Sequence, residues 1–392
     1  MNLMETFLLV VAILLLMPSL VILIQVISAY LPKKHTSLTL AEDKVIAVLI
    51  PAHNESSGIV ATLSSIQAQL RPQDRLLVVA DNCSDDTAEV ALKNRAEVIK
   101  RQDSEKRGKG YALDFGLRHL SQNPPDAVVI IDADCLLEKN ALQQLAAKAL
   151  LRGRPVQALY LMYAKGVDLK SKIAEFAWCV KNLVRPLGYA NLGLPCQLMG
   201  TGMAFPWATI SNADLANGNI VEDMKLGIDL ALAGTPPIFY LQSKVTSYFP
   251  LASEVQSGQK TRWEHGHLAM LITEAPRLFV QGLYKRDINL IAMAFDLAVP
   301  PLALLVMLLL GYAGITAAIF MLNGMGQSAL QVTLLSIAFL AMAIAFAWWG
   351  WGKRIISFSA LLSVPIYVIL KVPHYFKFLF KRQKTWNKTE RD

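Results

Sequence analysis

The stretch "AVVIIDADCLLE", Ala127 to Glu138, carries a short apolar run directly into two carboxylates, Asp132 and Asp134. A continuous apolar run of about four to eight residues is typical of a strand that is buried on both faces of a parallel sheet. Two carboxylates one residue apart at the end of such a strand need a counter-charge if they are buried. A pair of exposed acids in a turn is the alternative, which an isolated Asp-x-Asp does not exclude.

The same plan recurs on both sides of this stretch. Further strands are predicted by the apolar runs "KVIAVLI" (44–50), "RLLVVA" (75–80), "AEVIKR" (96–101) and "PVQALYLMYA" (155–164). We expect helices between them, which makes a doubly wound, mostly parallel α/β sheet. Polar residues follow the strands at Asn54-Glu55, at Asp81-Asn82 and at the aspartate pair. Because ligands of such sheets bind beyond the carboxyl ends of the strands, we expect these residues to converge on one crevice.

A divalent cation would supply the counter-charge that Asp132 and Asp134 need. Oxygen ligands select hard ions such as Mg²⁺ or Mn²⁺, and Mg²⁺ commonly completes its coordination with phosphate oxygens. The segment Arg107-Gly108-Lys109-Gly110 adds positive charge at the start of a predicted helix, which suits a phosphate, although a solvated charged loop is the alternative. The glycine spacings of a P-loop and of a dinucleotide-binding first turn are absent from the sequence.

The N-terminal segment from Phe7 to Tyr30 is apolar and uncharged, and it is long enough to cross a bilayer core of about 30 Å. A cleaved signal peptide would have a basic start and a shorter core, whereas Lys33 and Lys34 follow this segment. We therefore expect a retained anchor, and the positive-inside rule places the following domain in the cytoplasm.

The C-terminal third contains two further apolar segments that are long enough to span, 297–322 and 329–351. The loop between them is uncharged, and Lys353 and Arg354 follow the second, which suits an outer loop and an inner end. A third apolar run, 355–370, is too short for a straight crossing and precedes a basic tail. We expect that run to be re-entrant or interfacial.

Composition supports a membrane protein and argues against a nucleic-acid partner. Of 392 residues, 54% are hydrophobic and 17% are charged, below the roughly 25% that soluble domains carry. The net charge of +8 comes largely from clusters beside the predicted spans, where basic residues usually meet anionic lipid headgroups. The four cysteines, Cys83, Cys135, Cys179 and Cys196, have no metal-ligand spacing, so we expect reduced, mostly buried thiols.

Several short motifs follow one another in a fixed order. They are "PAHNE" (51–55), "ADNCSDDT" (80–87), "RGKGYAL" (107–113), the Asp-x-Asp of 132–134, "GTGMAF" (200–205), "VED" (221–223) and "QKTRW" (259–263). As a set, they resemble the membrane-bound branch of glycosyltransferase family 2, which includes the cellulose, chitin, hyaluronan and poly-N-acetylglucosamine synthases. The resemblance covers about residues 44 to 265 and the arrangement of the spans.

The resemblance implies a GT-A fold and assigns roles to individual residues. Donor binding falls to Pro51, Asn54, Glu55, Asp81, Asp85, Lys109, Asp132, Gln259 and Arg262. Acceptor binding falls to Gly200, Thr201, Gly202 and Trp263. Asp132 and Asp134 would hold Mg²⁺ or Mn²⁺ on the diphosphate, and Asp223 with Glu222 would be catalytic, Asp223 as the general base.

Two of these assignments have alternatives. Glu222 and Asp223 begin a predicted amphipathic helix, where the helix dipole alone favours acids. Trp263 lies beside basic residues near the membrane and could be an interfacial anchor.

From these observations and the resemblance, we predict an inverting β-glycosyltransferase of the plasma (inner) membrane with a cytoplasmic catalytic domain. Its partners would be a nucleotide-sugar donor, taken as UDP-linked from the family, a growing cell-surface polysaccharide, membrane lipids and an export or accessory subunit. Transfer of one sugar to a lipid-linked acceptor or glycolipid is an alternative, and so is a non-catalytic nucleotide- or glycan-binding subunit. The predicted parts are an anchor (1–32), a GT-A domain (40–265), an interfacial helix (266–290), a membrane region (291–376) and a basic tail (377–392).

Overall fold

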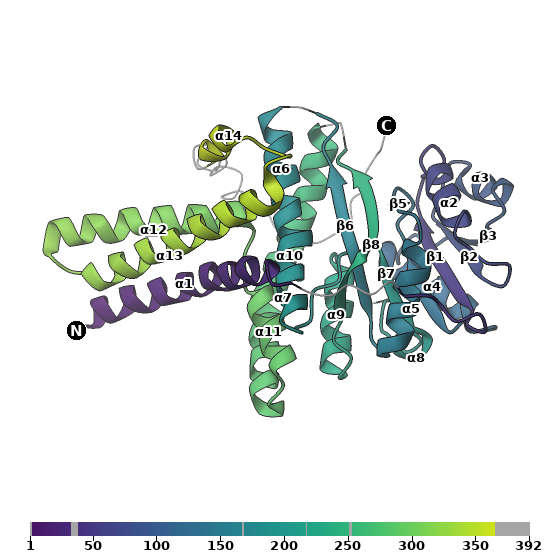
Figure 1. Ribbon diagram of the computed structural model, residues 1–392, viewed down its shortest axis with the longest axis horizontal. Helices are drawn as coiled ribbons and strands as arrows, with labels where there is room; N and C mark the ends of the chain where they lie inside the picture. The colour runs from purple at the N-terminus through teal and green to yellow at the C-terminus, as the bar shows by residue number, and fades with distance from the viewer. Residues whose placement is uncertain (1, 33–37, 167, 217, 251–252, 365–392) are drawn as a thin grey trace. The chain divides into compact units, whose positions relative to one another are not determined.

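The computed structural model describes residues 2–32, 38–166, 168–216, 218–250 and 253–364, and the side chains of 253–261 lie outside this description (Figure 1). The chain divides into two compact units. Of the described residues, the helical unit contains 2–32, 166, 168–192 and 264–364, and the sheet unit contains 38–165 and 193–263 apart from 217 and 251–252.

The sheet unit is built on one eight-stranded sheet with the order β3-β2-β1-β4-β7-β6-β8-β5 (Figure 1). Its strands are β1 (Ile46–Ala52), β2 (Arg75–Asp81), β3 (Glu97–Arg101), β4 (Ala127–Ile130), β5 (Leu136–Leu137), β6 (Val156–Tyr163), β7 (Met203–Pro206) and β8 (Ile238–Tyr248). Its helices are α2 (Ile59–Gln67), α3 (Thr87–Lys93), α4 (Lys109–Leu120), α5 (Ala141–Arg152), α8 (Trp207–Ile210) and α9 (Glu222–Leu232).

The predicted doubly wound sheet is confirmed, with an antiparallel insertion in its middle. Strands β1 to β4 pair in parallel, with β1 between β2 and β4. Strand β7 then pairs antiparallel to both β4 and β6, and β6 pairs in parallel with β8. We did not predict β7 or β8. Strand β7 is only four residues long, and much of β8 alternates between buried and partly buried positions and carries a register shift opposite Ala158 and Leu159.

One face of the sheet forms the main core with α4 and α9. The residues in this core are Ala47, Leu49, Leu77, Val79, Val128, Ile130, Met203 and Phe205 from the strands, with Leu113, Leu117, Leu120, Leu226 and Leu230 from the helices. Ile46, Val48 and Ile50 alternate with the β1 members of that set and are also fully buried. The predicted strands read as continuous apolar runs because both faces of the sheet are covered.

The helices that follow β1 and β2 both begin after loops that bind each other. Helix α2 begins at Ile59 after Gly58, and α3 begins at Thr87, in both cases without a side-chain cap. The side chains before these helices join the two loops instead. Asp85 accepts hydrogen bonds from the backbone N–H of Ser56 (3.1 Å) and of Thr87 (3.1 Å). Asn54 Oδ1 accepts from the N–H of Ser84 (2.8 Å).

The helical unit contains three helices that are long and apolar enough to cross a membrane: α1 (Leu3–Ala29), α12 (Leu302–Asn323) and α13 (Gln327–Ala347) with its π-helical extension Trp348–Gly352. They match the three predicted spans, and α13 packs against both α1 and α12 (Figure 1). The unit also contains α6 (Leu169–Cys179), a π-helical turn (Val180–Val184), α7 (Arg185–Asn191), α11 (Ile288–Leu297) and α14 (Phe358–Leu362). Helix α10 (Ser253–Lys285) begins in the sheet unit and continues into this one. Residues 365–370 of the apolar run 355–370, and the basic tail, lie outside the described residues, so the prediction of a re-entrant segment stays a prediction.

A buried polar contact and a close backbone approach join α1 to α7 and α11. Arg185 donates to Gln25 Oε1 (2.7 Å) and to Asp296 Oδ1 (2.8 Å), and Gln25 also donates to Asp296 (2.7 Å). One turn further along α7, Gly188 lies directly against the backbone carbonyl of Gln25, so that any added Cβ would overlap it. The charges of Arg185 and Asp296 are largely buried, and they stay paired only when α1, α7 and α11 keep this alignment along their axes.

Substitution of Gly188 by Ala is expected to destabilise the helical unit, because the new methyl group meets backbone that cannot move aside. Overpacking of this kind typically costs about 1–3 kcal/mol. Thermal unfolding of the detergent-purified variant should show a lowered midpoint.

The matched control is Gly311→Ala in the middle of α12, where an added Cβ meets nothing within 4 Å. That variant should keep the wild-type midpoint or exceed it, since alanine is the better helix former. Equal midpoints for the two variants would contradict the close α1–α7 packing.

Candidate active site

The aspartate pair lies directly after β4, at the carboxyl end of a fully buried strand. The backbone N–H of Asp132 donates to Thr201 Oγ1 (3.0 Å), which ties the pair to the loop that precedes β7. A carboxylate oxygen of Asp132, one of Asp134 and the sulfur of Cys135 all lie within 4.8 Å of one another. This group is close enough for a single cation to contact its members.

The chemistry of this group fits a hard divalent cation. Burial raises the pKa of the Cys135 thiol well above its ordinary value, so the sulfur stays protonated and is a poor ligand. Two carboxylates remain, which is the number that Mg²⁺ or Mn²⁺ usually takes from a protein when phosphate oxygens complete the shell.

Lys109, the first residue of α4, reaches into this acidic group. It follows Gly108, whose φ of +129° few other residues tolerate. The ammonium lies 2.5 Å from Asp132 Oδ1 and 3.9 Å from Glu222 Oε1, and it donates to the carbonyl of Gly200 (2.8 Å). The neighbouring Gly110 cannot carry a side chain, because an added Cβ would overlap the carbonyl of Leu215. Both glycines of this motif therefore have steric reasons to be there.

Glu222 and Asp223 open α9 and face the same cluster. An added Cβ on Gly200, which has a φ of +88°, would lie 3.4 Å from Asp223 Oδ2 and 3.5 Å from Lys109 Nζ. Burial raises the pKa of Glu222 to about 7; the positive charge of Lys109 opposes this shift and the negative charge of Asp223 adds to it. The structure thus brings together five residues of the predicted site: Lys109, Asp132, Gly200, Glu222 and Asp223.

A buried glutamine that we did not predict holds the loop of Gly200. Gln157, fully buried in β6, accepts from the N–H of Met199 (2.8 Å) and donates to the carbonyl of Thr201 (2.9 Å). This amide fixes both peptides that flank Gly200. The signal in the sequence was a single polar residue inside the apolar run "PVQALYLMYA".

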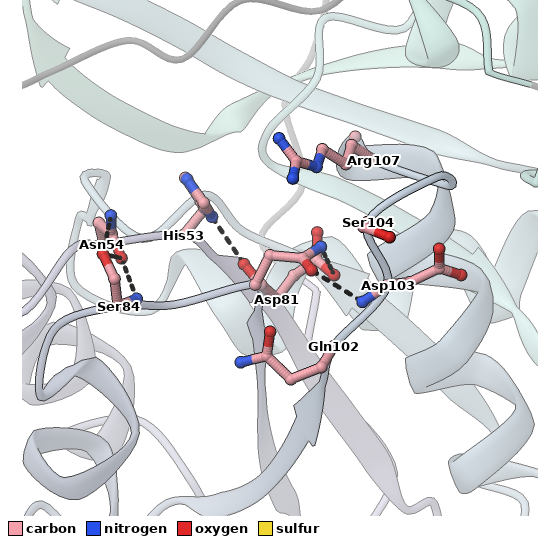
Figure 2. A pocket seen from close by; sticks show the side chains of 10 residues that line it. His53, Asn54, Asp81, Ser84, Gln102, Asp103, Ser104 and Arg107 are labelled. Carbon is pink, nitrogen blue, oxygen red and sulfur yellow. Dashed lines mark hydrogen bonds between the residues drawn. The ribbon is translucent and has the colours of Figure 1, made fainter.

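A second part of the site is a pocket of about 470 Å³ at the carboxyl ends of β1, β2 and β3 (Figure 2). Its volume lies in the range of small-molecule sites, about 300–1,000 Å³. It is lined by His53, Asn54, Asp81, Asn82, Ser84, Gln102, Asp103, Ser104, Arg107 and Gly108. Of the predicted donor residues, Asn54 and Asp81 are among these. The pocket extends to Gly108, the residue before Lys109.

The acid of this pocket, Asp81, is held by a counter-charge. Arg101, the last residue of β3, donates to Asp81 Oδ1 (2.7 Å), and each side chain is only 9% exposed. The same guanidinium also donates to Asp103 (3.1 Å) and to the carbonyl of Lys106 (2.7 Å). We did not predict Arg101, although a basic residue at the end of the third predicted strand was the available signal. It joins Asp81 to the loop that leads to Lys109.

The remaining predicted site residues do not line this pocket, or their side chains lie outside the described part of the chain. Pro51 is inside β1, and neither it nor Glu55 nor Asp85 lines the pocket. The N–H of Glu55 donates to Thr87 Oγ1 (2.8 Å), so Glu55 and Asp85 take part in joining the two loops. The side chain of Gln259 lies outside the described residues.

Two further predicted residues, Arg262 and Trp263, lie partly buried in α10. The Nε of Arg262 is buried and has no hydrogen-bond partner among the side chains that the structure describes. The positive charge of Arg262 acts to lower the pKa of Glu222. Thr201 and Gly202 lie in the loop before β7, where Thr201 is fully buried.

The family model "Glycosyltransferase like family 2" matches residues 43–266, which is more than half of the chain. The chain belongs to this glycosyltransferase family. The predicted recognition is thereby confirmed, and the motifs that carry it lie on the elements described above.

Two curated relatives of this glycosyltransferase match parts of it. A probable glycosyltransferase, YdaM of Bacillus subtilis, is 27% identical over 60% of this chain and 58% of its own length. The poly-beta-1,6-N-acetyl-D-glucosamine synthase of Staphylococcus aureus (strain COL) is 31% identical over 29% of this chain and 27% of its own. The chain thus spans little more than half of the one relative and about a quarter of the other.

Among solved structures, a mannosyltransferase of Pyrobaculum calidifontis, determined with GDP-mannose and Mn²⁺, has a TM-score of 0.54 and 18% identity. The match covers 87% of this chain and 97% of that one. At this identity the likeness concerns the fold, which is that of a GT-A glycosyltransferase.

Replacing Arg101 by Met is expected to destabilise the sheet unit by about 3–5 kcal/mol, because it leaves the carboxylate of Asp81 buried without its counter-charge. Thermal or denaturant unfolding should show the loss, and the double variant with Asp81→Asn should recover part of it. The control is Lys100→Met, whose partner Glu89 lies 2.6 Å away in an exposed pair. That change should cause no measurable loss, and an equal loss in both variants would contradict the role of the buried pair.

The raised pKa of Glu222 predicts a pH dependence of stability. The folded protein holds this proton more tightly than the unfolded chain does, so the free energy of unfolding should fall as the pH rises from about 4.5 to about 7. The slope should reach at most about 1.4 kcal/mol per pH unit. Glu222→Gln should lose this part of the slope, as measured by unfolding at pH 5 and pH 8. Parallel profiles of the variant and the wild type would show that Glu222 does not titrate in this range.

Proposed function

We propose that this glycosyltransferase is an inverting, metal-dependent enzyme that transfers a sugar from a UDP-linked donor to a growing cell-surface polysaccharide at the membrane. The observation that carries the proposal is the convergence of Lys109, Asp132, Glu222 and Asp223 beside the pocket that ends at Gly108. Within this proposal, residues 40–265 are the catalytic domain, which the family match over 43–266 supports.

The arrangement of the two parts suits a nucleotide sugar. A nucleoside would occupy the pocket, where His53, Asn82 and Gln102 offer polar groups to a base or ribose. Its diphosphate would then lie toward Gly108 and Lys109, at the N-terminus of the twelve-residue helix α4, where backbone N–H groups and the helix dipole favour anions. The sugar would lie beyond it, toward Asp223.

The residues of the cluster have separate tasks in this reaction. A divalent ion held by Asp132 and Asp134 would neutralise the charge of the departing nucleoside diphosphate. Asp223 would accept the proton of the attacking hydroxyl as general base, and the loop of Gly200 would bound the acceptor. A single base and a one-step displacement imply inversion, so an α-linked donor would give a β-linked product. Glu222, protonated more readily than usual, would limit the negative charge around Asp223.

Two observations support the proposed acceptor: the helices that could span a membrane, and the name of one relative. The three helices that could span a membrane would keep a growing or lipid-linked glycan close to the site. The staphylococcal relative is named as a polysaccharide synthase, which supports a polymer product. We infer a plasma-membrane protein with the sheet unit in the cytoplasm, where nucleotide sugars are made, and with an accessory or export subunit as a further partner.

The test uses the full chain in nanodiscs with Mn²⁺ or Mg²⁺ and a panel of UDP- and GDP-sugars. Release of nucleoside diphosphate from one donor, lost in Asp134→Ala, would establish the transferase and identify the sugar. Sizing the product separates a polymer from a single added sugar on a lipid. Release from a GDP-sugar alone would overturn the UDP assignment.

Asp223→Asn is expected to lower turnover by about 10²–10⁴-fold while leaving the donor affinity within a few-fold of wild type, because the amide keeps the shape but cannot take a proton. Turnover and donor binding should be measured on the same preparation. If Asp223→Asn keeps the function of the wild-type protein and still binds nucleotide, that result would favour a non-catalytic binding subunit.

A further inference from the structure

The ammonium of Lys109 lies where it competes for the predicted metal ligand. It is 2.5 Å from Asp132 Oδ1, a distance typical of a strong charge-assisted hydrogen bond. The carbonyl of Gly200 accepts a second proton of the same ammonium at 2.8 Å. Glu222 lies further out, at 3.9 Å. In this structure the ammonium of Lys109 is therefore bound to Asp132 and to the loop that contains Gly200.

The surroundings keep this lysine charged. Its side chain is 21% exposed, and those of Asp132 and Glu222 are 31% and 16% exposed. The carboxylates of Asp132 and Glu222 lie 2.5 Å and 3.9 Å from the ammonium, so the lysine is paired as a cation. The cluster thus contains a fixed positive charge in contact with one of the two carboxylates that would bind a divalent ion.

A metal ion and this ammonium cannot use Asp132 independently. A cation bound by Asp132 and Asp134 would share a carboxylate with Lys109 and would be repelled by it, since both are positive. The competition ends if an anion gives the ammonium another partner. The diphosphate of the donor would arrive near Lys109, because Gly108, the residue before it, lines the pocket.

We propose that Lys109 is an internal cation that occupies Asp132 until the donor binds, and that its ammonium then transfers to the diphosphate and frees Asp132 for the metal. This inference rests on the proposed function. No covalent bond changes in the step: one ion pair is exchanged for another, and the two positive charges of the metal ion offset the two negative charges of the donor diphosphate. Donor and metal would then increase each other's affinity by the same factor, as linkage requires.

A purely structural role for Lys109 predicts the opposite sign. If the lysine only braced the loop of Gly200, its removal would loosen the site and weaken metal binding. If it competes, then its removal should strengthen metal binding in the absence of nucleotide. Metal affinity without donor therefore distinguishes the two roles, and it does not depend on turnover.

The experiment measures Mn²⁺ affinity of the full chain in nanodiscs by the electron paramagnetic resonance signal of the free ion. Wild type, Lys109→Met and Lys109→Arg are titrated with Mn²⁺ alone and again with UDP. Without UDP, Lys109→Met should bind Mn²⁺ about tenfold more tightly than wild type, the size expected for removal of a partly buried charge pair. Lys109→Arg keeps the charge and should stay within about threefold of wild type. UDP should strengthen Mn²⁺ binding in wild type and do so less in Lys109→Met.

Equal or weaker Mn²⁺ affinity of folded Lys109→Met would overturn the proposal, and so would an absence of any effect of UDP on the wild type. If Lys109→Met does not fold, Lys109→Gln and the wild-type titration with UDP decide the question. Loss of Mn²⁺ binding in Asp134→Ala confirms that the ion occupies the predicted site. Failure of the proposed function has a different signature, namely no Asp134-dependent Mn²⁺ binding in any variant, with or without UDP, and that result would overturn both.

Discussion

The ion pair between Lys109 and Asp132 is the interaction on which the acidic edge of the sheet depends. Four carboxylates, those of Asp132, Asp134, Glu222 and Asp223, lie at the ends of β4 and α9, and the ammonium of Lys109 lies beside Asp132 and Glu222. Charges taken out of water are tolerated only when they are paired. The fold meets this condition by starting α4 at Lys109 and by shaping the loop of Gly200 so that its carbonyl receives the same ammonium.

The pocket at the carboxyl ends of β1, β2 and β3 obeys the same constraint with different residues. Asp81 is buried at the end of β2, and Arg101 at the end of the neighbouring strand neutralises it. Arginine suits this place because its fork also reaches Asp103 and the carbonyl of Lys106, so that one side chain fixes three segments. The loop between β3 and α4 is thus held at both of its ends by a cation in contact with an acid, Arg101 at one end and Lys109 at the other.

The sequence predicted the parts of this protein that depend on local pattern. Apolar runs located β1, β2, β3, β4 and β6, and uncharged stretches located the three candidate spans, because burial on both faces or in lipid leaves a continuous signature. The motifs located Lys109, Asp132, Glu222 and Asp223. Strands β7 and β8 were missed, because one is four residues long and the other is only partly buried at many of its positions. Arg101 and Gln157 were missed for another reason: their importance lies in partners far along the chain, Asp81 and the loop 199–202, which only the folded sheet brings near. The assigned roles of the site residues remain predictions.

The joined loops after β1 and β2 have a consequence for how a ligand is admitted. Asn54, Glu55 and Asp85 bind each other's loops through backbone groups, so the rim of the pocket is in place before anything occupies it. A ligand that enters loses its own freedom but does not have to order the wall that receives it. Selection among ligands at this rim would then depend on how well each one fits a wall that is already ordered.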